Sequence, residues 1–94
     1  MARAIWNGTV IAESDTFEEV EGNVYFPPSA IRKDHFEPST RTSVCPWKGT
    51  ASYYDVVVGG ERNPAAAWFY PDTKAEAKHI EGFVAFWNGV QVER

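Results

Sequence analysis

The chain contains a single cysteine and only two histidines, and this scarcity argues against several classes of protein. One cysteine cannot form an internal disulfide, so a secreted scaffold held together by disulfides is not expected. One cysteine and two widely separated histidines also supply no pair of ligands at the spacing of common metal sites. We therefore predict neither a metal site nor a cofactor.

Long apolar runs and basic clusters are missing as well. Residues 1–8 lack the apolar stretch of a signal peptide or a membrane span, so we expect a cytoplasmic protein with no membrane partner. Nine Lys and Arg against 13 Asp and Glu give a net charge of -4 and a pI near 5.0. Binding to a phosphate backbone calls for a basic patch, and Arg32-Lys33 is only a pair. Nucleic acid is therefore not an expected partner.

Two common catalytic signatures are also absent. No serine stands in a Gly-x-Ser-x-Gly context, and no glycine-rich loop ends in Gly-Lys-Ser/Thr. The sequence thus favours neither a serine hydrolase nor a nucleotide-binding P-loop.

Aromatic residues are abundant, with six Phe, four Tyr and four Trp among 94 residues. A chain of this length builds a small core, and large rings give such a core much contact area. More rings than one core needs would leave some of them lining a cleft. The composition therefore predicts an aromatic pocket.

Two Asn-Gly pairs with apolar flanks mark the two ends of the chain. Asn-Gly is the strongest short-range signal for a β-hairpin, because both residues tolerate positive φ. We expect residues 3–6 with 9–13 to form one hairpin, and residues 83–87 with 90–93 to form another. Further strands are expected at residues 20–26, 50–58 and 65–70, with a glycine turn at residues 59–60.

Two short helices are expected between the strands. One begins at Ser29, runs to residue 35 or 36 and ends before Pro38. The other covers residues 73–80, with Thr73 as the N-cap and Glu76 reaching back to it. No linker or low-complexity segment divides the chain. We predict one compact all-β domain over residues 1–94, made of two packed antiparallel sheets with one or two short helices.

The segment Cys-Pro-Trp-Lys-Gly at residues 45–49 concentrates the chemistry of the chain. Cys45 could be a nucleophile, with Lys48 lowering the pKa of the thiol, or a small buried apolar residue. Lys48 could hold an anion, with Gly49 allowing close approach of the backbone, or be a solvated lysine in a turn. Glu21 shares alternating strand positions with Asn23 and Tyr25, and it could act as an acid or base. Cys45, Lys48 and Glu21 are thus the catalytic candidates.

The ring-rich segments are expected to meet at this motif. A domain this small has room for one aromatic cluster, so Cys45, Trp47 and Lys48 should lie beside Tyr25 and Trp68. The predicted ligand-binding residues are Tyr25, Trp47, Lys48, Trp68 and Tyr70. Cys45 is expected to be mostly buried within the cluster.

Several motifs occur together in one order along nearly the whole chain. They include Tyr-Phe-Pro at residues 25–27, the segment at residues 45–49, Tyr53-Tyr54 and Ala67-Trp68. In these motifs the chain resembles the domain of unknown function 427 family. The resemblance implies a small, compact β fold. A nucleotidyltransferase label is sometimes attached to this family, so the resemblance also raises that activity as an alternative. The acidic residues here are dispersed and do not form the Mg²⁺-binding cluster that nucleotidyl transfer requires.

Three functions remain open at this point. The first is a module that binds a small ligand, anions included, in the aromatic pocket. The second is a small enzyme, either nucleotidyltransferase-like or thiol-dependent. The third is a protein-interaction domain. No pattern in the sequence specifies an oligomeric state.

Overall fold

Turns built on glycine divide the chain into short antiparallel strands. The computed structural model describes residues 1–94, and seven glycines in it have positive φ. The nine strands are β1 (Ala2–Trp6), β2 (Thr9–Ser14), β3 (Glu18–Val20), β4 (Asn23–Tyr25), β5 (Phe36–Cys45), β6 (Gly49–Val58), β7 (Glu61–Phe69), β8 (Val84–Phe86) and β9 (Gln91–Glu93).

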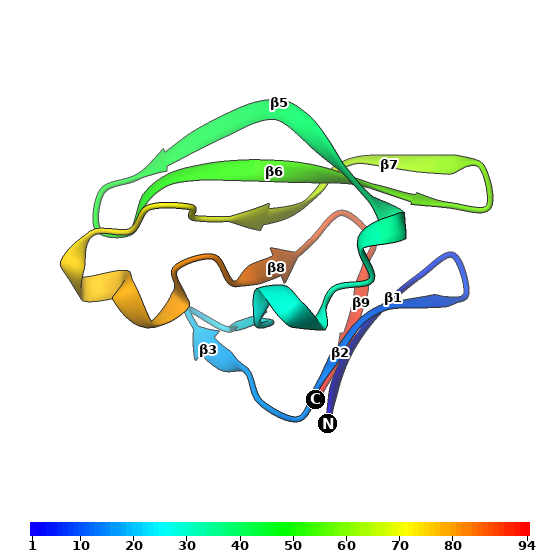
Figure 1. Cartoon of the computed structure of the whole chain (residues 1–94), viewed down its shortest axis with the longest axis horizontal. Helices are drawn as coiled ribbons and strands as arrows, with labels where there is room; N and C mark the ends of the chain where they lie inside the picture. Colours follow the sequence, from blue (N-terminus) through cyan, green and yellow to red (C-terminus); the bar gives the residue numbers. More distant parts are fainter.

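The strands form three antiparallel sheets (Figure 1). The larger sheet has the order β5-β6-β7-β8, the smaller one β2-β1-β9, and β3 pairs with β4 alone. A bridge between Phe26 and Val84 joins the β3–β4 hairpin to the edge of the larger sheet. The prediction of an all-β domain of packed antiparallel sheets is confirmed, with the two-stranded hairpin as an addition.

The first Asn-Gly hairpin is confirmed, but the second is wrong. Asn7-Gly8 joins β1 to β2, which pair along their length. Asn88-Gly89 also has positive φ at both residues, yet the strands beside it do not pair with each other. Strand β8 pairs with β7, and β9 crosses to pair with β1. The second turn therefore carries the chain from one sheet to another.

The strand expected at residues 20–26 is also wrong, because the chain folds back inside it. Glu21 and Gly22 have φ values of 54° and 80° and form the turn between β3 and β4. Glu21 therefore shares no strand face with Asn23 and Tyr25. A second difference is β5, which covers residues expected to be partly helical and includes Pro38.

Both expected helices are replaced by 3-10 turns. The first becomes two turns, η1 (Pro28–Ala30) and η2 (Lys33–His35), with extended backbone at Ile31. The second is η3 (Ala75–Ile80), which has no side-chain cap. The hydroxyl of Thr73 instead donates to the carboxylate of Glu81, and so does its backbone N–H. None of these short helices has the length and apolar character needed to cross a membrane.

The larger sheet buries side chains on both of its faces. The inner core lies between this sheet and the smaller one, and the outer cluster lies on the opposite face. The inner core consists of Ala2, Ala4, Ile11, Ala12, Val24, Phe26, Val56, Val58, Ala66, Ala67, Val84 and Phe86. The outer cluster consists of Tyr25, Ala51, Tyr53, Ala65, Tyr70, Ala77, Ile80 and Ala85.

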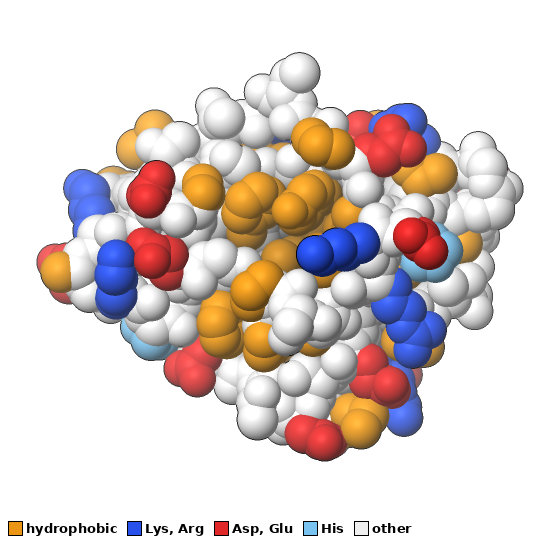
Figure 2. All heavy atoms as spheres, in the orientation of Figure 1, with side chains coloured by type: hydrophobic (Ala, Val, Ile, Leu, Met, Phe, Trp, Pro, Cys, Tyr) orange, Lys and Arg blue, Asp and Glu red, His pale blue; other side chains and the backbone are white.

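The alternation of strand side chains separates these two groups. Along β8, Val84 and Phe86 enter the inner core, and Ala85 enters the outer cluster. Tyr25 and Phe26 diverge in the same way. In the view of Figure 2, apolar side chains gather in the middle of the face and most charged side chains lie around its margin.

Candidate functional site

An open hollow lies over the outer cluster. It has a volume of about 160 Å³ and is lined by Lys48, Tyr53, Trp68, Tyr70 and Trp87. Four of its five lining residues are aromatic, and the fifth is the only buried charged residue of the chain. Strands β6 and β7 provide Tyr53 and Trp68, whereas Lys48 comes from the turn between β5 and β6.

The turn that carries Lys48 is held against a neighbouring loop. The carbonyl of Lys48 accepts a hydrogen bond from the N–H of Lys74, with N and O 3.0 Å apart. Gly49 has a φ of 123°, and a Cβ atom there would lie 2.9 Å from the carbonyl oxygen of Asp72. Glycine is therefore required because the backbone of this chain approaches closely, and not because a ligand does.

Lys48 is buried and paired. It is 6% exposed, and its Nζ lies 2.5 Å from a carboxylate oxygen of Glu21. Burial acts to lower the pKa of Lys48, but the hydrogen bond to Glu21 and the nearby phenols outweigh burial and raise the pKa. The same hydrogen bond lowers the pKa of Glu21. Lys48 is therefore a permanent cation, and its Nζ also lies 5.2 Å and 5.6 Å from the ring centres of Trp47 and Tyr70.

Hydrogen bonds between side chains fix the rings around the hollow. The indole N–H of Trp68 donates to the hydroxyl of Tyr25, and the two rings meet edge to face. The hydroxyls of Tyr53 and Ser43 are 2.8 Å apart. Burial raises the pKa of Tyr70, so its phenol stays protonated at neutral pH. The walls are thus aligned before any ligand enters.

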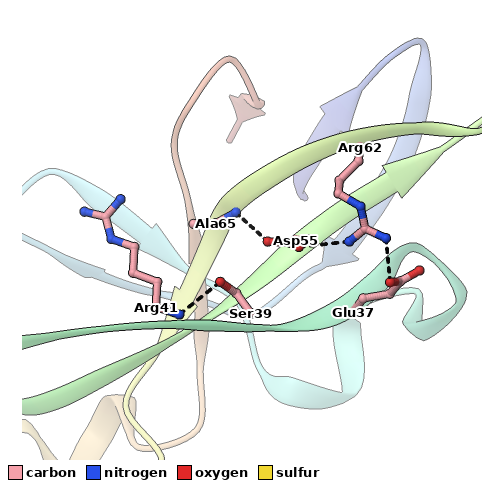
Figure 3. Close-up of polar contacts among 6 residues, drawn as sticks. All are labelled: Glu37, Ser39, Arg41, Asp55, Arg62 and Ala65. Atoms are coloured by element: carbon pink, nitrogen blue, oxygen red, sulfur yellow. Dashed lines mark hydrogen bonds and ion pairs between the residues drawn. The ribbon is translucent and has the colours of Figure 1, made fainter.

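Trp87 is positioned by an irregularity in the larger sheet. Its indole N–H donates to the carbonyl of Ala65, with N and O 2.6 Å apart. Ala65 has a φ of 50° beside the bulge between β6 and β7, and its N–H donates to Asp55. Figure 3 shows that Asp55 also accepts from Arg62, which reaches Glu37 on β5. Asp55 thus holds the backbone to which Trp87 is anchored.

Arg41 lies against two of the lining rings. Its Cζ is 4.8 Å from the ring centre of Tyr53 and 5.0 Å from that of Trp87. In Figure 3 the guanidinium extends away from the Asp55–Arg62–Glu37 group, whereas the backbone N–H of Arg41 donates to Ser39. An exposed cation therefore borders the hollow.

The structure brings most of the predicted site residues together. Lys48, Trp68 and Tyr70 line the hollow, Tyr25 is fully buried beneath Trp68, and Trp47 lies against the Lys48 cation. Glu21 meets Lys48 from the β3–β4 turn. The sequence interpretation placed neither Arg41 nor Trp87 at the site, and it did not include Tyr53 among the ligand-binding residues. Alternation along β5 puts Arg41 on the face of Ser43, but that strand was not predicted.

Cys45 lies at the end of β5, where it packs against the outer cluster while remaining half-buried. It is therefore less buried than we expected, and it does not line the hollow. The ring of His35 contacts the carbonyl of Val57, at the far end of β6 from the Cys45–Gly49 pair. His35 is thus too distant to act as a base for this thiol. No group of three or more His, Cys, Asp or Glu side chains is close enough to hold a metal ion.

These features define a small all-β domain with a cation-containing aromatic hollow on the outer face of its larger sheet. The chain belongs to the family described as Domain of unknown function (DUF427), whose sequence profile matches residues 1–94. The resemblance inferred from the motifs is therefore confirmed. No curated protein matches the chain.

Proposed function

We propose that this protein is a binding module for a small planar molecule, which it holds in the hollow above Lys48. The observation that carries the proposal is a buried lysine that opens into an aromatic hollow. An ammonium group has three N–H donors, and Glu21 is the only carboxylate paired with this one. The remaining donors are free to meet an oxygen atom of a ligand.

The size of the hollow favours a single ring. A cavity of about 150 Å³ accommodates benzene, and the hollow here has a volume of about 160 Å³. The rings of Trp68 and Trp87 meet at 86° and provide two walls at right angles. A flat ligand can stack on one wall while its edge meets the other.

The charges in the site favour an anionic or neutral ligand over a cation. Aromatic cages for ammonium groups offer the electron-rich faces of their rings to the ligand. Here the Lys48 and Arg41 cations already lie against the rings of Tyr70, Tyr53 and Trp87. These ring faces are therefore already occupied, and a second cation in the hollow would be repelled by the unpaired guanidinium of Arg41.

A substitution of Lys48 separates binding from folding. Because Glu21 is exposed, Lys48→Met leaves no unpaired buried charge, and methionine has a similar shape. We expect the free energy of unfolding to change by less than about 1 kcal/mol. Benzamide, a neutral planar probe, should shift the indole N–H NMR signals of Trp68 and Trp87 in the unchanged protein and shift them less in the variant.

Lys33→Met is the matched control, since this exposed lysine has no ion pair and lies away from the hollow. It should bind benzamide like the unchanged protein. If neither benzamide nor other one-ring probes shift the two indole signals, the ligand-binding proposal is wrong. If Lys48→Met then also destabilises the protein strongly, the motif serves folding, and an interaction domain becomes the better hypothesis.

A further inference from the structure

The five arginines of the chain fall into two groups. Arg3, Arg32, Arg62 and Arg94 each pair with at least one carboxylate. Arg41 pairs with none, although the chain has 13 acidic residues and a net charge of -4. Its guanidinium instead lies against two rings that line the hollow.

We propose that Arg41 selects the ligand of this hollow by its charge, so that the module binds a planar ring carrying one carboxylate or similar acidic group. This inference rests on the proposed function and names the chemical class of its ligand. The guanidinium presents five N–H donors in a planar fork that matches a carboxylate. None of these donors has a partner among the side chains or backbone carbonyls of this chain.

The balance of charge around the hollow indicates how many acidic groups the ligand carries. Glu21 neutralises Lys48, so this pair contributes no net charge to the site. Arg41 adds one uncompensated positive charge at the edge. A ligand with one negative charge makes the site neutral, whereas a ligand with two leaves an excess negative charge beside Glu21.

Arg41 lies in an irregular part of β5, and its guanidinium is placed by its contacts with the rings of Tyr53 and Trp87. Residues 41 and 43 of β5 point to the same side of the strand, and Ser43 is bonded to the hydroxyl of Tyr53. Stacking on Tyr53 and Trp87 restrains the long side chain, which reduces the entropy lost when a ligand binds. The guanidinium is thus prepared for a ligand that enters between these rings.

Benzoate and benzamide test the proposal, because they share size and planarity and differ in charge. Indole N–H shifts of Trp68 and Trp87 report the affinity of each probe. Arg41→Ala should weaken the affinity for benzoate by about tenfold to a hundredfold, which is the range expected for one hydrogen bond to a charged group. The affinity for benzamide should change by less than about threefold. Arg41→Lys, which keeps the charge but loses the planar fork, should give an intermediate loss.

Lys33→Ala controls for net charge, since it removes one exposed positive charge away from the hollow. It should leave both affinities unchanged. If Arg41→Ala weakens both probes equally, or neither, Arg41 does not select by charge and the inference is wrong, whereas the proposed binding of planar rings stands. If neither probe binds the unchanged protein, the proposed function itself is wrong.

Discussion

Tyr25 and Phe26 are neighbours in the chain, and both are fully buried, but they serve different parts of the molecule. Phe26 enters the inner core, where it packs edge to face on Phe86. Tyr25 enters the outer cluster and accepts a hydrogen bond from Trp68. The inner core is built from apolar side chains alone, whereas the outer cluster combines rings with hydroxyls and lies beside a buried cation.

This contrast separates stability from recognition on the two faces of one sheet. The inner core has no leucine to fill it, because the chain contains none, and small alanines pack around a few large side chains. The outer cluster is only partly covered, and the rings left accessible there form the hollow. Changes on the inner face should therefore act on folding, and changes on the outer face should act mainly on the geometry of the site.

The largest effect is expected at the inner core. Phe26→Ala removes a fully buried ring and leaves a cavity against Phe86, which should cost about 3–5 kcal/mol of unfolding free energy. Urea denaturation measures this loss. Val44→Ala is the control, since Val44 is 79% exposed and should change stability by less than about 0.5 kcal/mol. A loss below about 1 kcal/mol for Phe26→Ala would contradict the assignment of stability to the inner core.

A smaller effect is expected at the outer cluster. Tyr25→Phe keeps the ring but removes the acceptor for the indole N–H of Trp68, which should cost about 1 kcal/mol. The indole signal of Trp68 should shift at the same time. Tyr54→Phe is the matched control on the inner face, because the hydroxyl of Tyr54 makes no hydrogen bond, and its stability should stay unchanged. If Tyr25→Phe and Tyr54→Phe change the free energy of unfolding equally, the hydroxyl groups of the two faces do not differ in the way we propose.

The smallest effect on stability is expected at Glu81, which binds Thr73 and Lys78 in the segment that packs beside the outer cluster. The N–H of Thr73 and the Lys78 ammonium hold the pKa of Glu81 below its ordinary value of 4.5. The folded protein therefore binds this proton less readily than the unfolded chain, so the carboxylate adds stability above pH 4.5 and loses it as the pH falls further. Glu81→Gln should lower stability at neutral pH and flatten its decline in acid.

Glu76→Gln is the control for this pH dependence. Glu76 is exposed on η3 and has no hydrogen-bond or ion-pair partner, so its substitution should leave the acid profile unchanged. Thermal unfolding between pH 3 and pH 7 compares the variants. An acid profile for Glu81→Gln identical to that of the unchanged protein would show that the segment adds nothing through this carboxylate.

Local turn chemistry could be predicted from the sequence, but strand pairing could not. Both Asn-Gly pairs adopt positive φ as expected, and so do Gly59 and Gly60. Pairing depends on which distant strand offers a free edge, and this information is not local. Strand β5 was not predicted either, because Pro38 and several polar residues weaken its local pattern. The hydrogen bonds that hold it come from β6, which is again information that the local sequence does not contain.

The candidate site divides in the same way. Lys48, Trp68 and Tyr70 could be predicted, because a conspicuous motif and ring-rich segments carry them. Arg41 and Trp87 could not, because each reaches the hollow through its strand or turn position in the larger sheet. Glu21 and Lys48 were both candidates, but their ion pair was not predicted, because the turn that brings Glu21 to Lys48 was interpreted as a strand.

The pairing of β1 with β9 has a consequence for the order of folding. Ala4 lies opposite Val92, so this contact closes a loop that contains all the other strands, β2 to β8 (Figure 1). Contacts between residues so distant in sequence form only after the entropy of loop closure has been lost, which slows folding. The central strand of the smaller sheet therefore gains its second partner late, and folding of this domain should be slow and cooperative for a chain of its length.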